Sequence, residues 1–387
     1  MSGSRADPRR AALDAEILAW MAEAWPPLSP SSPLSPSSAG SHDDARFERL
    51  ARELFRFQFE HCGAYRRFCS ARGATPDSIA SWREIPAVPT GAFKEVTLRS
   101  FPAELHSKTF RTSGTSTAAR GELQLDTVAL YEASLMPTIR HFLFPDLAVD
   151  ERMTLRILAA PPGEQPDSSL SHMFGCALDR IGTPASRFDV CDGVLAIDAL
   201  TAGLEAASDR AEPVALCGTA FAFVHLLEAL ETQPPIRLAP GSRVMETGGF
   251  KGRSRELPRE ELYAEIERRL GIAANRIVNQ YGMTELGSQF YDSVLAYPEE
   301  PRRKLGPPWT RVRVVDPETG RDARPGAVGT IVIHDLANTG SVAAIATADL
   351  GRSIDSATGE AGFDVLGRQP DAEARGCSIA AELMLAR

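Results

Sequence analysis

Between residues 155 and 282 the sequence alternates short apolar runs with segments of helical periodicity, and this alternation restricts the fold to a few possibilities. The apolar runs end at Pro or Gly, as strands do, and they are shorter than buried helices. Strands that alternate with helices are typical of an α/β domain with a largely parallel sheet. We expect strands at 155–160, 213–219, 242–249 and 276–282, and helices at 196–208, 221–230 and 258–270.

The flanking segments have different patterns. From about residue 305 the chain becomes β-rich, with two strands expected around a turn-rich loop in 310–336. Upstream, helical spacing predicts helices at 9–24, 45–72 and 128–144, and the Pro pair at 85–89 should break regular structure. Pro and Ser dominate residues 25–44, which we interpret as a disordered linker.

Composition excludes several classes of protein. The 387 residues are 43% hydrophobic, enough for a real core in two or three domains. The net charge of −9 argues against general nucleic-acid binding. Six cysteines in 387 residues are too sparse for a disulfide scaffold, and the lack of a C-x-x-C pair argues against a zinc ribbon or a thioredoxin-type site. The absence of a long apolar run or a signal-peptide pattern predicts no membrane span and a cytoplasmic enzyme.

The first motif with chemical content is the run of hydroxyl residues and glycines at 112–121. It contains Thr112, Ser113, Gly114, Thr115, Ser116 and Arg120. Such a loop can surround a polyphosphate, because its backbone N–H groups approach closely and its hydroxyls donate hydrogen bonds. It matches no Walker motif, and an ordinary Ser/Thr/Gly turn remains the alternative.

The second motif, at 279–285, follows an expected strand directly. Ligands of α/β sheets bind outside the carboxyl ends of strands. There Tyr281 could stack on a base, Thr284 could hold a phosphate oxygen, and Glu285 could ligate Mg²⁺. The alternative is a strand end followed by a helix that Thr284 caps.

Two weaker motifs follow. Asp349, at the end of an expected strand, could accept two hydrogen bonds from a ribose diol, although a turn aspartate is the alternative. Arg368 follows Gly367, and a second Arg-Gly pair stands at 375–376. Neither motif is informative by itself.

In their order along the chain, the four motifs resemble those of the adenylate-forming (acyl-AMP-generating) superfamily. The finer resemblance is to the acyl-protein synthetases of bacterial luminescence (LuxE type), which are related to phenylacetate–CoA ligases. It covers residue 45 to the C-terminus and is most specific in the run Glu-Thr-Gly-Gly-Phe-Lys-Gly-Arg at 246–253. The resemblance implies the large N-terminal domain of these enzymes over 45–366, with parallel-sheet subdomains and a β-rich subdomain. A helix at 1–24 and a linker at 25–44 precede it, and a short hinge and tail at 367–387 stand where a larger C-terminal lid would be.

The resemblance also implies roles for individual residues. ATP and Mg²⁺ would be the cofactors, and a carboxylic acid, expected to be fatty, would be activated to acyl-AMP. Thr112, Ser113, Gly114, Thr115, Ser116 and Arg120 would hold phosphates. The adenine would be surrounded by Gly248, Gly249, Tyr281 and Gly282. Thr284 would contact the α-phosphate, Glu285 would bind the Mg²⁺, and Asp349 would bind the ribose. Arg368 would lie at the hinge. Thr117 and Arg120 depart from the usual Gly and Lys, and Arg is bulkier than Lys.

The acyl group would then pass to a protein thiol. Cys377 occupies the place near the C-terminus where LuxE-type enzymes carry an acylated cysteine, and Arg375 would favour its thiolate. A reductase or carrier protein would be the partner that finally accepts the acyl group. Two alternatives remain: a ligase that transfers a small or aryl acid to CoA or a carrier protein, and a non-catalytic nucleotide-binding scaffold.

Overall fold

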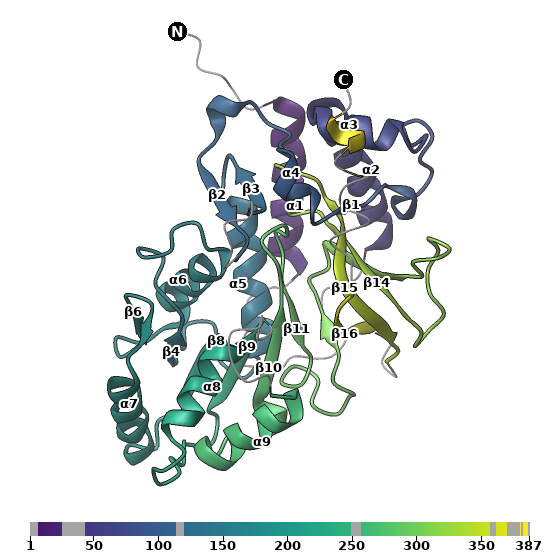
Figure 1. Cartoon of the computed structure of the whole chain (residues 1–387). Coiled ribbons are helices and arrows are strands. Elements are labelled where there is room, and N and C mark those ends of the chain that lie inside the picture. The colour runs from purple at the N-terminus through teal and green to yellow at the C-terminus, as the bar shows by residue number, and fades with distance from the viewer. Residues whose placement is uncertain are drawn as a thin grey trace.

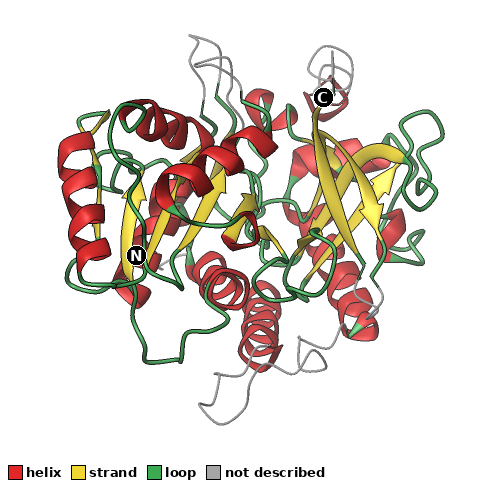
Figure 2. Ribbon diagram, turned by 90° about the horizontal axis from the view of Figure 1, so that it is seen from below, coloured by secondary structure: helices red, strands yellow, loops and turns green. Residues whose placement is uncertain are grey.

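One half of the main sheet is parallel and is covered by helices on both faces (Figures 1 and 2). The computed structural model describes residues 7–24, 43–113, 120–248, 257–356, 361–369, 380 and 382–385. Its parallel strands follow the order β5-β4-β8-β9-β10. They are β4 (Thr154–Leu158), β5 (Arg187–Phe188), β8 (Val214–Thr219), β9 (Arg243–Thr247) and β10 (Ile277–Tyr281). This confirms the predicted strand–helix alternation.

The covering helices divide the core into two layers. Alternate residues of the strands face opposite sides: Leu216 packs into one hydrophobic cluster and its neighbour Cys217 into the other. Such strands are buried on both faces, which explains why they are continuously apolar. One layer contains α7 (Ile197–Asp209), α8 (Ala220–Ala229) and α9 (Arg259–Leu270), and the other contains α5 (Ala129–Leu143) and α6 (Ser169–Ile181).

Beyond β10 the sheet continues as antiparallel strands in the order β11-β12-β16-β15-β14-β13. The predicted pair in 310–336 is confirmed, because β13 and β14 pair antiparallel. At 88–89 the expectation of irregular structure is wrong, because β1 pairs parallel with β15. A proline is tolerated where no further strand needs its missing N–H. The bounds are β1 Val88–Pro89, β11 Phe290–Asp292, β12 Lys304–Leu305, β13 Thr310–Val315, β14 Val328–Asp335, β15 Ala344–Ile354 and β16 Gly362–Arg368.

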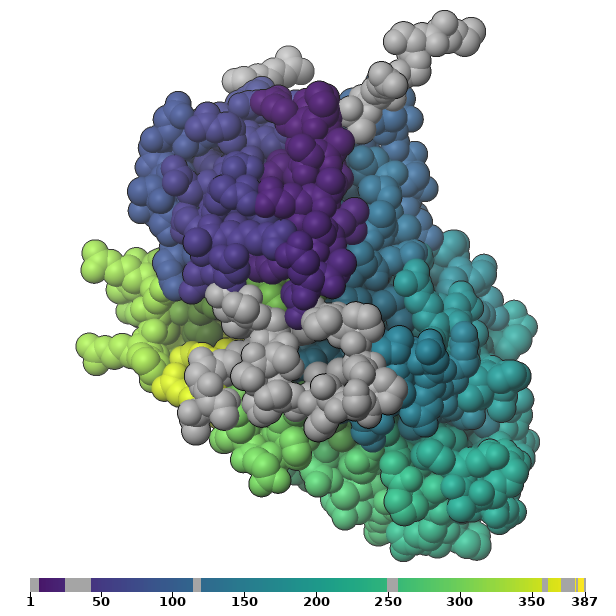
Figure 3. Space-filling view, turned by 180° about the vertical axis from the view of Figure 1, so that it is seen from behind, coloured from purple at the N-terminus to yellow at the C-terminus, as the bar shows by residue number. Residues whose placement is uncertain are grey.

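The N-terminal helices pack on the body of the molecule. α1 (Pro8–Ala24) contacts α5 and α2 and forms part of one face (Figure 3), with Ile17 and Trp20 buried beneath it. The predicted helix at 45–72 is two helices, α2 (Asp44–His61) and α3 (Gly63–Ser70), because Cys62 between them has extended backbone angles. The predicted linker at 25–44 lies outside the described residues except for its last two positions.

Shorter elements complete the described chain. They are α4 (Ala92–Glu95), β2 (Lys108–Arg111), β3 (Glu122–Leu125), β6 (Val190–Cys191), β7 (Val194–Leu195), and 3₁₀ turns at Trp82–Glu84, Ala103–Leu105 and Ala274–Arg276. In the described residues, we find no helix both long and apolar enough to cross a membrane.

The C-terminal residues return to the N-terminal helices. Ala380 and Met384 are fully buried, and Arg67 of α3 donates from Nε to the Met384 carbonyl oxygen at 2.6 Å. The chain is therefore anchored again three residues after Cys377, which itself lies outside the described residues.

Candidate active site

The predicted phosphate loop connects β2 and β3, which form a two-stranded hairpin. The hairpin closes at Thr112 and Gly121: each amide donates to the other residue, Thr112 N to Gly121 O and Gly121 N to Thr112 Oγ1, both at 2.9 Å. Ser113 is exposed at the start of the loop, whereas Gly114, Thr115 and Ser116 lie outside the described residues. The structure thus shows the base of the loop, where Thr112 fixes the geometry.

Arg120 lies across this base. Its Nε donates to the Thr112 carbonyl oxygen at 2.7 Å, and its Nη1 stands 3.2 Å from Asp167 Oδ2. Arg111 approaches the same carboxylate at 3.6 Å. The guanidinium is therefore oriented by the protein and remains partly exposed on the side of the loop.

The second motif places a buried carboxylate beside the hairpin. After β10 the chain turns and enters β11, so no helix begins at Thr284 in this described stretch. Glu285 is only 5% exposed, and its carbonyl oxygen accepts from Asn338 Nδ2 at 2.8 Å. A Cβ on Gly121 would lie 3.5 Å from Glu285 Oε1, so a glycine allows the two motifs to approach closely.

Tyr281, Asp349 and Arg368 meet at the end of β10. The Tyr281 hydroxyl donates to Asp349 Oδ2 at 2.8 Å, and Arg368 Nε lies 3.9 Å from Asp349 Oδ1. Burial, reinforced by the Asp349 charge, raises the pKa of Tyr281 well above its usual value, so this hydroxyl remains a donor. Three predicted site residues from distant parts of the sequence are thus brought together.

Gly248 joins this edge from the neighbouring strand. β9 and β10 pair in register with Thr247 opposite Gln280, so Gly248 follows β9 where Tyr281 ends β10. Its φ of +74° lies in the left-handed region that glycine adopts readily. Gly249 lies outside the described residues. A Cβ on Gly282 would stand 2.5 Å from Gln280 Nε2, so a side chain there requires Gln280 to move.

Glu246 is a residue to which the sequence analysis assigned no role. It is buried within β9, and its Oε1 accepts from Asn279 Nδ2 at 2.6 Å and from the Tyr263 hydroxyl at 2.9 Å. Burial raises its pKa. The signal available in the sequence was a carboxylate in the buried strand Arg-Val-Met-Glu-Thr, two residues before Gly248.

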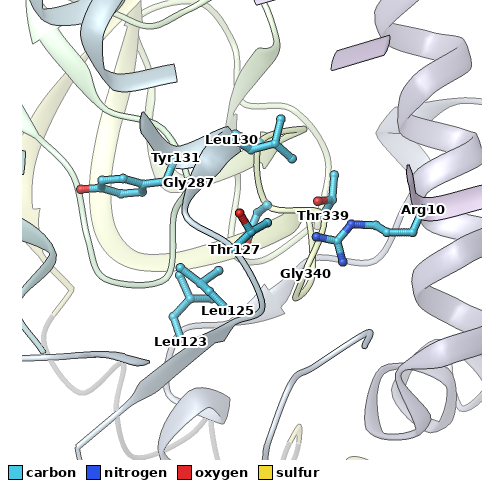
Figure 4. A pocket seen from close by; sticks show the side chains of 11 residues that line it. Arg10, Leu123, Leu125, Thr127, Leu130, Tyr131, Gly287, Thr339 and Gly340 are labelled. Carbon is cyan, nitrogen blue, oxygen red and sulfur yellow. The ribbon is translucent and has the colours of Figure 1, made fainter. Parts of the chain in front are cut away.

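Figure 4 shows a small cavity beside these loops, into which Arg10 reaches from α1 towards Thr339 and Gly340. Leu123, Leu125 and Leu130 line its apolar side. Arg10 is already paired with Asp14 at 2.9 Å and with Asp126 at 3.2 Å. With room for about one water molecule, the cavity does not hold an acyl chain in this conformation.

None of the five cysteines in the described part of the chain is activated as a nucleophile. Burial raises the pKa of Cys62 above its usual value. It raises the pKa of Cys69 and of Cys217 to about 12 and that of Cys176 to about 11. The pKa of the exposed Cys191 is raised by the charges of Asp192 and Glu164. Arg72 and Arg243 lower the pKa of Cys69 and Cys217, but the cost of burying a thiolate outweighs these charges.

The sheet, parallel in one half and antiparallel in the other, has the fold of the adenylate-forming ligases, as comparison with solved structures shows. Two solved structures of 2-hydroxyisobutyryl-CoA ligase share the fold. The open form with 2-HIB-AMP and CoA has a TM-score of 0.60 at 16% identity, covering 88% of this chain and 79% of that one. The postadenylation form with 2-HIB-AMP has a TM-score of 0.62 at 16% identity, covering 88% and 72%.

The sequence comparisons are more specific. The pattern of the family described as "Acyl-protein synthetase, LuxE" matches residues 175–385, more than half of the chain. The long-chain-fatty-acid–luciferin-component ligase of Aliivibrio fischeri is 25% identical over 312 residues, which are 79% of this chain and 78% of the relative. The chain belongs to the LuxE family of acyl-protein synthetases. It is an ATP-dependent, AMP-forming ligase that activates an acyl group.

Proposed function

We propose that this enzyme activates a fatty acid as acyl-AMP at the carboxyl edge of β9 and β10 and then transfers the acyl group to a protein thiol. One observation carries the proposal: Tyr281 bonds to Asp349, 68 positions away, while Glu285 of the same turn lies beside Gly121 of the phosphate hairpin. The proximity of these side chains supports a proposal in which groups suited to ribose, phosphate and a divalent cation surround one short turn.

In the first half-reaction a carboxylate oxygen attacks the α-phosphorus of ATP, and pyrophosphate leaves. The departing phosphates would be held by the hairpin residues Thr112, Ser113 and Arg120 and by the loop residues Gly114, Thr115 and Ser116. Thr284 would contact the α-phosphate. Oriented donors that neutralise charge in the transition state are the main source of catalysis in such transfers.

The nucleoside would lie against the Gly248–Gly249 turn and Tyr281–Gly282. Asp349 would accept from the ribose hydroxyls on the oxygen that Tyr281 does not use, and Arg368, 3.9 Å from that oxygen, would help to orient the carboxylate. Glu285 fits Mg²⁺, because it is a buried carboxylate beside the phosphate hairpin and Mg²⁺ prefers oxygen ligands. When bound, the cation would neutralise phosphate charge.

In the second half-reaction a thiolate attacks the acyl carbon, and AMP leaves. We propose Cys377 as this thiol. The raised pKa values of the other five cysteines support it, as does the anchored chain at Ala380, which limits how far Cys377 can stray from the body of the protein. The relative named for a long-chain fatty acid supports a fatty substrate and a protein partner, such as a reductase or carrier, that takes the acyl group onward.

The test combines pyrophosphate release with intact-mass measurement. The full chain is incubated with Mg·ATP and acids from acetate to palmitate, and the mass of the protein is then recorded. We expect release to depend on a long-chain acid and the protein to gain one acyl group. Cys377→Ser should abolish the adduct and leave the first turnover of pyrophosphate intact, whereas the matched Cys191→Ser variant should behave as wild type.

Two outcomes contradict the proposal in different ways. Acid-dependent release without an adduct, together with thioester formation on added CoA, would make CoA the acceptor. ATP binding without pyrophosphate release for any acid would instead indicate a nucleotide-binding scaffold.

A further inference from the structure

Outside the proposed nucleotide site, three metal-ligating side chains converge between two packed helices. His172 and Cys176 are four residues apart on α6, so they share one face of that helix. Glu132 comes from the first turn of α5, which packs against α6. One ligand atom from each residue lies within 4.8 Å of the other two, and His172 Nε2 stands 3.1 Å from Glu132 Oε1.

We propose that Glu132, His172 and Cys176 form a binding site for a zinc-like transition-metal ion. Imidazole nitrogen, thiolate sulfur and carboxylate oxygen are the ligands that Zn²⁺ takes in proteins. Ligand atoms arranged tetrahedrally around this ion stand about 3.3–3.8 Å apart. The His–Glu pair is already that close at 3.1 Å, and since the thiol lies within 4.8 Å of both partners it has to approach by at most about 1.5 Å.

The surroundings of the cluster favour one fixed geometry. The rings of Phe110 and Tyr131 pack against the His172 ring, with centroids at 5.5 and 5.7 Å. All three ligands are only partly buried, so a water molecule can complete the coordination from the open side. The apolar shield and the open face together match a site with three protein ligands.

The charges around the cluster are mixed. Glu132 and Asp179 favour a cation, whereas Lys108 of β2 and Arg180 of α6 oppose it; Arg180 lies 3.7 Å from Glu132. An ion bound here would therefore compete with Arg180 for the Glu132 carboxylate.

Such an ion would clamp the hairpin side of the molecule. The Tyr131 hydroxyl donates to the Ser169 carbonyl oxygen at 3.1 Å, and the Arg111 amide donates to the Asp167 carbonyl oxygen at 2.8 Å. The start of α6 is thus tied both to α5 and to the phosphate hairpin. An ion that joins α5 to α6 would hold the base of that hairpin in place without contacting the nucleotide.

Direct metal binding tests this site without ATP or acid, so the result does not depend on the proposed function. The full chain is stripped with a chelator, titrated with Zn²⁺, and its metal content measured. Co²⁺ serves as a second probe, because a thiolate ligand gives it a sulfur-to-metal charge-transfer band. We expect one ion per chain, a Co²⁺–thiolate band, and a melting temperature that rises with Zn²⁺.

Variants then locate the ion. Cys176→Ser should remove the Co²⁺ band, and His172→Gln and Glu132→Gln should each weaken Zn²⁺ binding at least tenfold, with folding checked by circular dichroism. Glu132→Gln preserves the shape of the side chain, so its effect does not come from lost packing. Cys377→Ser should bind as wild type.

Cys191→Ser is the matched control, because Glu164, Cys191 and Asp192 form a second, fully exposed cluster. No stoichiometric binding by wild type, a band that survives Cys176→Ser, or a band lost in Cys191→Ser would each overturn the proposal.

Discussion

Asp349 connects two motifs of the proposed site, and its removal gives the sharpest test at the scale of single residues. Asp349→Ala deletes both the acceptor of the Tyr281 hydroxyl and the group proposed to hold the ribose. We expect ATP affinity, measured by calorimetry, to fall at least tenfold, which corresponds to about 1.4 kcal/mol. The free energy of unfolding should fall by about 1–2 kcal/mol, because a buried donor loses its partner.

Tyr281→Phe separates the two roles of this carboxylate. It removes the donor but keeps Asp349, so no buried donor is left without a partner, and we expect both a smaller loss of stability and a smaller loss of ATP affinity than in Asp349→Ala. Equal affinity of Asp349→Ala and wild type would show that Asp349 does not contact the nucleotide.

Asp335 gives a prediction with a defined pH window. It is fully buried behind the second motif, where it accepts from the amide and hydroxyl of Ser288, both at 2.8 Å. Burial raises its pKa to about 6. A raised carboxyl pKa means that protonation stabilises the folded state below about pH 4 and that this contribution is lost as pH rises through about 6, by about 3 kcal/mol in total.

Asp335→Asn cannot titrate, so the comparison isolates this residue. Its misplaced amide N–H₂ costs a constant amount, whereas the difference from wild type should shift in favour of the variant between pH 4.5 and 7.5. Urea unfolding at several pH values measures this difference. A difference that stays flat over that range would refute the raised pKa.

At the scale of elements, the turn after β9 depends on backbone conformation. Gly248 has a φ of +74°, and among the described residues no atom stands within 4 Å of an added Cβ, so we expect a substitution there to act through the backbone. Gly248→Ala should lower the free energy of unfolding by about 1 kcal/mol and weaken ATP binding. Gly248→Asn should retain more of both, because Asn tolerates this region. Thermal melts and ATP titrations of the two variants distinguish backbone strain from crowding. If crowding were the cause, the larger Asn would lower stability and ATP affinity more than Ala.

The elements of the parallel half could be predicted from the sequence because each is determined by a residue pattern within its own segment. Apolar runs such as 214–219 and helical periodicity such as 259–270 need no knowledge of distant residues, and the observed bounds lie within about two residues of those expected. The pairing of Val88–Pro89 with β15 is different, since it depends on a strand more than 250 residues away, and the extended backbone at Cys62 interrupts a helical pattern that continues in the sequence. Pattern alone predicted one long helix and an irregular segment in their place.

In the proposed site, too, the sequence identified single residues but not the contacts between distant ones. Motif resemblance identified Tyr281 and Asp349 separately, but their hydrogen bond exists only because β10 and β15 belong to one sheet. Glu246 was missed because its partners, Tyr263 and Asn279, are distant in the sequence and uninformative there. Residues whose roles depend on contacts across the sheet need the structure.

At the scale of the whole molecule, the C-terminal anchor links the ends of the chain. Met384 is fully buried beside α3, where Arg67 holds its carbonyl oxygen, although Leu385 next to it is 58% exposed. A buried Met cut back to Ala costs about 2–5 kcal/mol in a core. In a short terminal segment this loss is local and releases the anchor rather than unfolding the enzyme.

Met384→Ala should therefore separate the two half-reactions. The proposed adenylation residues lie elsewhere, so acid-dependent pyrophosphate release in the first turnover should stay within about twofold of wild type. Acylation of Cys377 should slow severalfold, because a tethered thiol has a higher effective concentration than a loose one. Leu385→Ala removes a neighbouring apolar side chain of similar size that is not buried, and it should leave both steps unchanged. Quenched-flow mass spectrometry follows the adduct, and limited proteolysis confirms that the anchor is released. If the released anchor leaves the acylation rate unaltered, the position of Ala380 and Met384 has no part in presenting the thiol; if it speeds acylation, the anchor restrains Cys377 rather than guiding it.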